Sequence, residues 1–311
     1  MRKIVLILVL LTSVLQAQGT YRVDTSYTVK STYTKLIKKY PFITIPVITE
    51  NKNVEQILNV PYFEEKQRTL HLDAFVNNKK KKNPVVIMIH GGGWRSGNKD
   101  QMNAMAQEIA AKGFSCFTIE YRLSLIAKYP YGVYDVKNAI KFIKGNAKKF
   151  KVDPDKIAVL GCSSGGQMAA LIGTTNGKSN FEDPSYKSSS SSKVNAIINV
   201  DGVLAFRHPE SSEGEMAAFW LGGSYEESTE NWKNASALNN TDGNTPPTLF
   251  INSSIPRFHA GRDDMIAILN QHKIYSEVHT LENSPHSFWF FQPWFSQTVD
   301  FTVNFLNKIF K

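Results

Sequence analysis

The sequence predicts an α/β fold in which helices cover both faces of a mostly parallel central sheet. Continuous apolar and β-branched runs such as 85–89 are typical of strands buried on both faces. These runs alternate along the chain with segments whose apolar residues have helical spacing, which indicates repeated β-α-β units. With 311 residues, 42% of them hydrophobic, the chain can bury one sizeable core.

The first half of the chain contains most of the clear patterns. Residues 70–76 alternate between apolar and polar, as a half-buried strand does. The helix expected over 105–111 ends at Gly113, and the helix expected over 133–150 has apolar residues three and four positions apart. The other elements expected in this half are the strands 85–89, 114–119 and 157–160 and the helix 167–172.

The second half continues the same alternation. Its expected elements are the strands 197–200, 248–251 and 276–281 and the helices 265–272 and 299–310. Residues 205–244 show no clear period, and they form either a cap over a functional site or an ordinary helical excursion. Because no internal repeat and no second domain are evident, residues 19–311 are expected to form one domain.

The N-terminus has the pattern of a secretory signal peptide. Arg2 and Lys3 give a positive start, residues 4–15 are almost all apolar, and Ala17 is a small residue suited to cleavage. The alternative is a membrane anchor, but the apolar run is shorter than the roughly 20 residues that a spanning helix needs. We therefore expect residues 1–18 to be a signal peptide of a secreted or periplasmic protein that does not insert into a membrane.

Composition excludes several classes of function. The formal net charge of +9 includes the run 79–82, an expected exposed loop, and it hints at an anionic polymer as substrate. No segment resembles a nucleic-acid-binding module, so no nucleic-acid partner is expected. The sequence has no metal-ligand cluster and no cofactor fingerprint, and no signal for an oligomeric state. Cys116 and Cys162 are expected to be buried free thiols.

The first chemical motif is Gly-Cys-Ser-Ser-Gly at 161–165. It fits G-x-S-x-G and lies between an expected buried strand and an expected helix, the setting of a nucleophile elbow. Glycines are needed there because side chains would clash with the tight turn and the neighbouring strands. The motif therefore predicts Ser163 as a nucleophile, and a glycine-rich structural turn is the alternative.

The second motif is His-Gly-Gly-Gly-Trp at 90–94, directly after an expected strand. A run of glycines lets backbone N–H groups converge on one point, where they can hold the negative oxygen of a tetrahedral intermediate. We assign this oxyanion hole to the amides of Gly92, Gly93 and Ser164, the residue after the nucleophile. His90 is expected to be structural.

The third motif is Pro-His-Ser-Phe-Trp at 285–289, which follows the last expected strand. Nucleophilic serines need a general base, and a histidine late in the chain fits the order serine, acid, histidine. His286 is therefore predicted to be the catalytic base.

The three motifs together resemble the secreted bacterial carbohydrate esterases of the α/β-hydrolase fold. That group includes pectin and xylan acetylesterases and the feruloyl/acetyl esterases, and the resemblance spans roughly residues 65–310. The segment 135–166 is similar to hormone-sensitive-lipase relatives as well. The resemblance implies an α/β-hydrolase fold and a Ser-acid-His triad without cofactor or metal.

The acid is the point at which this sequence departs from the family pattern. The fold usually carries it just after the strand that corresponds to 248–251, and no carboxylate stands there. Asp201 directly follows another expected strand, whereas Asp263 lies at the start of an expected helix, where it can serve as an N-terminal cap. We favour Asp201 because of its strand-end position, and keep Asp263 and then Glu282 as alternatives.

The resemblance implies an esterase that removes acetyl or feruloyl groups from plant polysaccharide such as pectin or xylan. Trp94 and Trp289 are the aromatic residues expected to contact a sugar ring or a feruloyl group. Core packing is the alternative for Trp289 and its aromatic neighbours. Two other functions remain open: a general carboxylesterase acting on small free esters, and a carbohydrate-binding module without catalytic activity.

Overall fold

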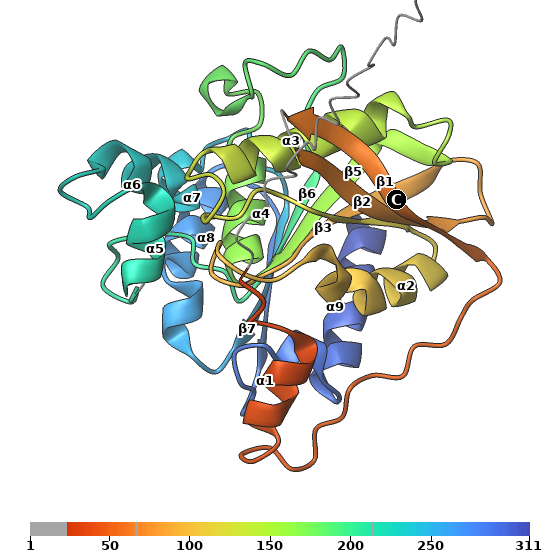
Figure 1. Cartoon of the computed structure of the whole chain (residues 1–311), viewed down its shortest axis with the longest axis horizontal. Helices are drawn as coiled ribbons and strands as arrows, with labels where there is room; N and C mark the ends of the chain where they lie inside the picture. Colours follow the sequence, from red (N-terminus) through yellow and green to blue (C-terminus); the bar gives the residue numbers. More distant parts are fainter. Residues whose placement is uncertain (1–23, 66–67, 213) are drawn as a thin grey trace, which may run out of the picture.

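The computed structural model describes residues 24–65, 68–212 and 214–311, and these ranges contain one sheet of eight strands (Figure 1). The strand order is β1-β2-β4-β3-β5-β6-β7-β8. β1 and β2 are antiparallel to their neighbours, and the other strands run parallel to one another. The strands are β1 Val54–Glu65, β2 Arg68–Asn77, β3 Asn83–Ile89, β4 Ser115–Ile119, β5 Val152–Cys162, β6 Ala196–Val200, β7 Thr248–Ser253 and β8 Ser276–Leu281.

From β3 onward, the helices of the described residues separate successive strands, and α1 precedes the first strand. They are α1 Val29–Leu36, α2 Asn103–Ala111, α3 Tyr131–Gly145, α4 Ser164–Thr174, α5 Gly214–Leu221, α6 Thr229–Ala235, α7 Ala237–Asn240, α8 Arg262–Gln271 and α9 Trp294–Ile309. The expected signal peptide, residues 1–18, lies outside the described residues.

Apolar layers cover the sheet on both faces. Successive side chains of a strand point to opposite faces, so Val85, Ile87 and Ile89 of β3 belong to one core cluster and Val86 and Met88 to the other. The first cluster includes residues of α3, α4 and α8, and the second includes residues of α2 and α9. Figure 1 shows these helix layers on the two sides of the sheet. The predicted α/β class is confirmed.

The N-terminal part of the fold was not predicted. α1 has eight residues and is mostly polar, and β1 is largely exposed, with Pro61 inside it and irregular register around Asn59. β1 carries no clean apolar period, whereas Val29, Tyr33 and Leu36 of α1 have helical spacing and pack against the core over only two turns. The helix predicted over 133–150 ends earlier, at Gly145, after which Phe150 still packs in the core from a turn.

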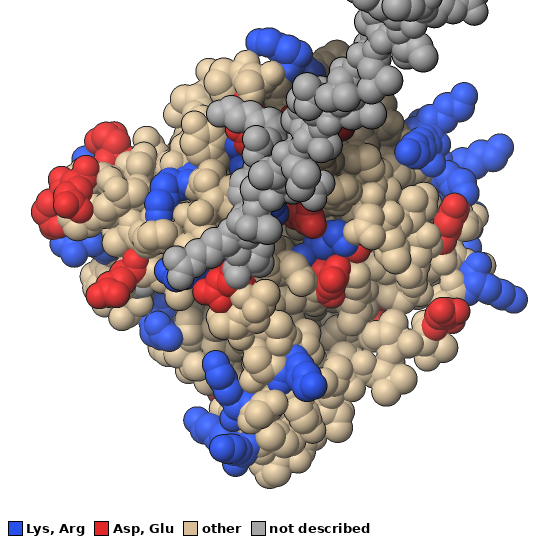
Figure 2. Space-filling model, in the orientation of Figure 1, with Lys and Arg blue, Asp and Glu red and all other residues tan. Residues whose placement is uncertain are grey.

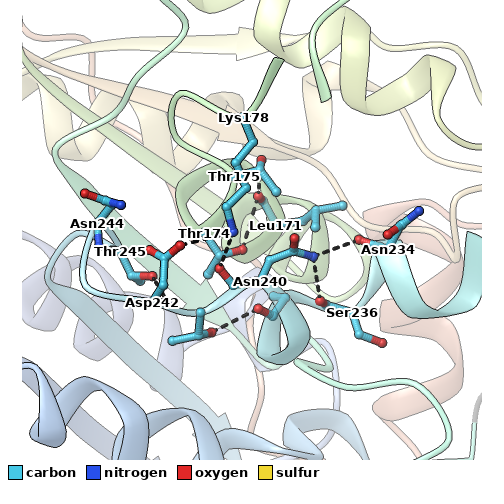
Figure 3. A network of polar contacts seen from close by, with 12 residues as sticks. Leu171, Thr174, Thr175, Lys178, Asn234, Ser236, Asn240, Asp242, Asn244 and Thr245 are labelled. Atoms are coloured by element: carbon cyan, nitrogen blue, oxygen red, sulfur yellow. Dashed lines mark hydrogen bonds and ion pairs between the residues drawn. The ribbon is translucent and has the colours of Figure 1, made fainter. Parts of the chain in front are cut away.

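Residues 205–244 form three short helices, α5 to α7, and a polar network fastens their end to the main domain (Figure 3). Lys178, which follows α4, donates to the carbonyl of Asn240 at 2.8 Å and pairs with Asp242 at 3.2 Å. The side chain of Asn240 donates to the carbonyls of Asn234 and Ser236. α6 and α7 are therefore anchored to α4.

Cys116 and Cys162 are free and buried, as predicted. Across the part of the chain that the structure describes, no helix is both long enough and apolar enough to cross a membrane.

Candidate active site

Ser163 stands in a strained turn between β5 and α4. Its backbone has φ 56° and ψ −123°, a conformation that costs energy for a residue with a side chain, and its N–H donates to the carbonyl of Val200 at 2.8 Å. A Cβ on Gly161 would lie 1.9 Å from the carbonyl oxygen of Gly165, and one on Gly165 would lie 2.3 Å from that of Ile89. The two glycines of the motif are therefore required by close backbone packing, as the elbow interpretation predicts.

Ser163, His286 and Asp201 form a hydrogen-bonded row. His286 Nε2 lies 2.8 Å from Ser163 Oγ, and His286 Nδ1 lies 2.7 Å from Asp201 Oδ2. The other carboxylate oxygen of Asp201 accepts the N–H of Ser253 at 2.9 Å. The Asp201 side chain is fully buried, whereas that of His286 is 21% exposed. The row can draw a proton from the serine hydroxyl, since each ring nitrogen has one partner.

The structure brings Asp201, and not Asp263, to the histidine. Asp263 is the second residue of α8, its side chain is 73% exposed, and its carboxylate accepts from Arg262 Nε at 2.7 Å. That hydrogen bond lowers the pKa of Asp263, as expected of a solvated ion pair. Glu282, the third alternative, is exposed beyond β8. The strand-end argument thus selected the carboxylate that contacts His286.

Two aromatic side chains enclose the His286 ring. Phe258 stacks on it with ring centroids 3.4 Å apart and planes at 10°, and the indole of Trp289 meets it edge-on at 5.1 Å. Phe258 comes from the short 3₁₀ segment Pro256–His259 after β7, and no motif pointed to it. Trp289 is 1% exposed and is not part of the pocket wall, so the prediction that it contacts substrate is wrong. Its place is in the core, where it supports the histidine.

In the glycine turn after β3, two carbonyl groups accept hydrogen bonds from nearby residues, and this fixes the direction of the amides that follow them. The carbonyl of Gly91 accepts from His90 Nδ1 at 2.9 Å, and the carbonyl of Gly92 accepts the N–H of Ser96 at 3.0 Å. In a trans peptide the C=O and the following N–H point in opposite directions. The N–H groups of Gly92 and Gly93 therefore point away from those partners, and both residues line the pocket.

A pocket of about 430 Å³ opens beside Ser163. Its wall includes all three residues assigned to the oxyanion hole, together with Trp94. The Trp94 ring is largely buried: it stacks on Trp220 at 4.7 Å, and its Nε1 donates to Gln167 at 2.9 Å. Trp94 thus belongs to the pocket wall with little of its side chain exposed. The wall residues that sequence analysis missed are Ser26, Tyr27, Lys35, Ser96, Val203, Ser212, Met216, Arg257 and Phe258.

The N-terminal segment forms one side of this pocket. The hydroxyl of the half-buried Tyr27 lies 3.0 Å from Ser287 Oγ, next to the histidine, and the Tyr27 carbonyl accepts from Gln101 Nε2 at 2.7 Å. Asp24 pairs with Arg95 at 3.3 Å. Burial raises the pKa of Tyr27 far above its ordinary value, so the phenol is neutral. On the other side, Met216 brings α5 to the pocket, while the cap role of 205–244 stays a prediction.

Within residues 24–65, 68–212 and 214–311, no group of three or more His, Cys, Asp or Glu side chains could hold a metal ion.

His90 is buried and neutral, which fits a structural role. Burial lowers its pKa to about 4, and its ring stacks on Tyr121 at 4.5 Å. Because the carbonyl of Gly91 can only accept, Nδ1 must carry the proton that forms the bond. His90 therefore fixes the first peptide of the glycine turn.

The buried histidine predicts a loss of stability in acid. The pKa of His90 falls from 6.5 to about 4 on folding. The contribution of His90 to the free energy of unfolding is therefore complete above pH 6.5 and decreases as the pH falls toward 4. At pH 5, His90 is protonated in the unfolded chain and remains neutral in the folded chain. This difference lowers the free energy of unfolding by about 2 kcal/mol. In His90→Asn, whose amide can replace the Nδ1 donor, urea unfolding at pH 7.5 and pH 5 should differ by about that much less than in the parent. An identical pH dependence in both proteins would mean that folding does not lower the pKa of His90.

Solved structures share this architecture. A truncated carbohydrate esterase from gut microbiota aligns with a TM-score of 0.70 and 22% identity, over 84% of this chain and 99% of that one. Esterase 2 of Thermogutta terrifontis aligns with a TM-score of 0.69 and 22% identity, over 84% of this chain and 96% of that one. At this identity the likeness establishes the fold, and the predicted α/β-hydrolase architecture is confirmed.

Sequence relatives are esterases by name. Esterase LipC of Mycobacterium tuberculosis is 31% identical over 195 residues, which cover 60% of this chain and 45% of that protein. The arylesterase of Saccharolobus solfataricus is 36% identical over 94 residues, 30% of each chain. The matches thus span less than half of these curated relatives.

The family assignment rests on a longer match. The BD-FAE family matches residues 72–274, more than half of the 311 residues. The matched range begins in β2 and includes the glycine turn, the elbow and Asp201, and it ends before His286. It agrees with the resemblance to feruloyl/acetyl esterases that the motifs predicted. On this match, the chain belongs to the BD-FAE family.

Proposed function

We propose that this chain is a serine esterase that removes acyl groups, such as acetyl or feruloyl, from plant cell-wall polysaccharide. The observation that carries ester hydrolysis is the row Asp201–His286–Ser163, which ends at a pocket beside the glycine turn. A nucleophile bonded to a base that a buried carboxylate orients is the arrangement of acyl transfer.

In the first half of the proposed reaction, Ser163 Oγ attacks the ester carbonyl carbon while His286 Nε2 takes the hydroxyl proton. The carbonyl oxygen becomes negative and is held by the N–H groups of Gly92, Gly93 and Ser164. Asp201 accepts a hydrogen bond from the Nδ1–H of His286 and stabilises the imidazolium that forms. The intermediate collapses when His286 returns the proton to the departing sugar oxygen, which leaves an acyl group on Ser163.

In the second half, water replaces the sugar alcohol. His286 takes a proton from the water as the resulting hydroxide attacks the acyl carbon, and the same N–H groups hold the second oxyanion. Collapse returns the proton to Ser163 Oγ and releases the free carboxylic acid. One ester and one water thus yield one acid and one alcohol, with the enzyme unchanged.

Polysaccharide as the carrier of the ester is supported by the names of two structural neighbours. One is the carbohydrate esterase from gut microbiota, and another is an acetyl ester-xyloside bifunctional hydrolase from Caldicellulosiruptor lactoaceticus. Export, which we propose from the pattern of residues 1–18, would place the enzyme where such polymers occur. A general carboxylesterase acting on small free esters is the second candidate, because the curated relatives carry general esterase names.

Release of acid from matched substrates separates the two candidates. Acetate and ferulate release should be measured on acetylated pectin, acetylated xylan and feruloylated arabinoxylan, with p-nitrophenyl acetate as the small ester. We expect kcat/KM on at least one polymer or its oligomers to exceed that on the small ester. Turnover of p-nitrophenyl acetate with no release from any polymer would favour the general carboxylesterase, and no turnover of any ester would reject the proposed activity.

A further inference from the structure

Two cationic side chains, Lys35 and Arg257, line the pocket that contains Ser163. Lys35 comes from α1 and Arg257 from the 3₁₀ segment after β7, so two remote parts of the chain bring positive charge to one site. The carboxylate among the residues that line the pocket is Asp201, which is fully buried and bonded to His286 and Ser253. The accessible charge of the pocket wall is therefore positive.

Neither cation has an acidic partner among the described residues. No carboxylate of residues 24–65, 68–212 and 214–311 lies within ion-pair distance of Lys35 or Arg257, and both side chains are exposed. The Arg257 guanidinium lies 4.1 Å from the ring centroid of Phe258, and one of its N–H groups reaches the carbonyl of Ser212 at 3.4 Å. The guanidinium thus lies over the ring that itself stacks on His286, and most of its five donors are left for a ligand.

The positive charge extends outward from the pocket along α1. Lys35, Lys38 and Lys39 have the spacing i, i+3 and i+4, which places them on one side of the helix and the turn that follows it. Residues 25–49 contain four lysines and no Asp or Glu. Figure 2 shows the same imbalance, with blue and no red side chains around α1 at the lower end of the molecule.

An exposed aromatic ring lies beside these lysines. Phe42 is 60% exposed, and edge contacts hold its ring at 5.7 Å from Trp294 and 6.1 Å from Tyr40. Such a ring offers a fixed apolar face to a sugar. Cations and an aromatic face on one surface suit a polymer that carries both sugar rings and negative groups.

We propose that the ester substrate of this site is a uronate-bearing polysaccharide, whose carboxylates bind Lys35 and Arg257 in the pocket and the lysines of α1 beyond it. The proposal rests on the proposed esterase function and names its substrate class. Carboxylates form charge-assisted hydrogen bonds with both cations, and the charged surface draws an anionic chain toward the pocket. A neutral backbone would use neither interaction.

Binding to two forms of one polymer tests the proposal directly. The Ser163→Ala protein should be titrated with polygalacturonate and with the same polymer fully methyl-esterified, which has the same sugar rings without the charge. We expect at least tenfold tighter binding to the carboxylate form, and a loss of that preference at about 0.5 M NaCl because salt screens exposed charges. Equal affinity for the two forms would overturn the proposal.

Variants locate the binding site. In the Ser163→Ala background, Lys35→Gln/Arg257→Gln should weaken binding to polygalacturonate about tenfold. The matched control is Lys80→Gln/Lys81→Gln, which removes the same charge from the exposed loop before β3, at the end of the strand opposite the pocket. We expect less than a twofold change in this control. Equal losses in the two variants would mean that net charge alone attracts the polymer, and the site would be refuted.

Catalysis gives a separate readout. On acetylated polygalacturonate, the Lys35→Gln/Arg257→Gln enzyme should show KM raised about tenfold, with kcat changed far less. A loss confined to kcat would contradict a binding role. Absence of p-nitrophenyl acetate turnover by the parent enzyme would reject the esterase function itself, whereas the binding titrations would still decide whether the carboxylate site exists.

Discussion

Replacing Ser163 with alanine is expected to lower ester turnover by a factor on the order of 10⁶ while the fold persists. The alanine removes the oxygen that attacks the carbonyl, and in the described chain Ser163 is the serine whose hydroxyl meets His286. The backbone at this position has positive φ, which serine and alanine tolerate about equally, so the strain of the turn is unchanged. Turnover of p-nitrophenyl acetate measures the loss, and circular dichroism checks the fold.

The companion variant is His286→Ala. Because the serine and the histidine act as one unit, the double variant should be no slower than either single one. Labelling with a reactive organophosphonate provides the control for the site of attack: one label per chain in the parent and none in Ser163→Ala. Two outcomes would contradict Ser163 as nucleophile. One is a loss of turnover in the double variant equal to the product of the two single losses, and the other is a label retained after the serine is removed.

The part of the site that the sequence predicted lies where a short motif fixes its own backbone. The elbow needs glycines at 161 and 165 because neighbouring main-chain atoms lie too close for a side chain. The motif shows this requirement directly, since both positions are glycine. The glycine turn at 90–94 is likewise local, and its geometry follows from hydrogen bonds within seven residues, His90 to Ser96. The α/β class was predictable because strands buried on both faces have continuous apolar runs.

The part of the site that the sequence did not predict comes from segments remote from the three motifs. Tyr27 and Lys35 precede the sheet by many residues, and Phe258 lies in a short 3₁₀ segment, so nothing in the local pattern marks them as pocket residues. Trp289 was assigned to substrate for the opposite reason. It stands in a motif beside His286, and aromatic residues in a motif look the same whether they face solvent or the core.

The choice between Asp201 and Asp263 required the order of strands in space. β6, β7 and β8 lie side by side and run parallel, so the residue after β6 and the histidine after β8 are at the same edge of the sheet and can meet. Sequence alone places Asp201 at a strand end but does not show which strand lies beside which. Function depends on that order as much as on the residue types.

Replacing Asp201 with asparagine is expected to lower turnover by a factor on the order of 10⁴. The amide keeps an oxygen for the N–H of Ser253, so the fold is retained, but it removes the charge that stabilises the imidazolium. It also offers an NH₂ group that favours the wrong tautomer of His286. Stopped-flow or steady-state turnover of p-nitrophenyl acetate measures the loss, and the melting temperature should change little.

Asp263→Asn is the matched control, since it makes the same chemical change at the other candidate carboxylate. Asp263 is 73% exposed, pairs with Arg262, and lies in the first turn of α8, where a negative charge interacts with the helix dipole. Losing that charge costs about 0.5 kcal/mol of stability at an exposed site. Turnover should remain within a factor of about two, because no atom of Asp263 contacts His286 in the row that ends at Ser163. If the two variants exchanged these outcomes, the segment between β7 and α8 would have to refold to bring Asp263 to the imidazole, and the buried contact of Asp201 would then be structural.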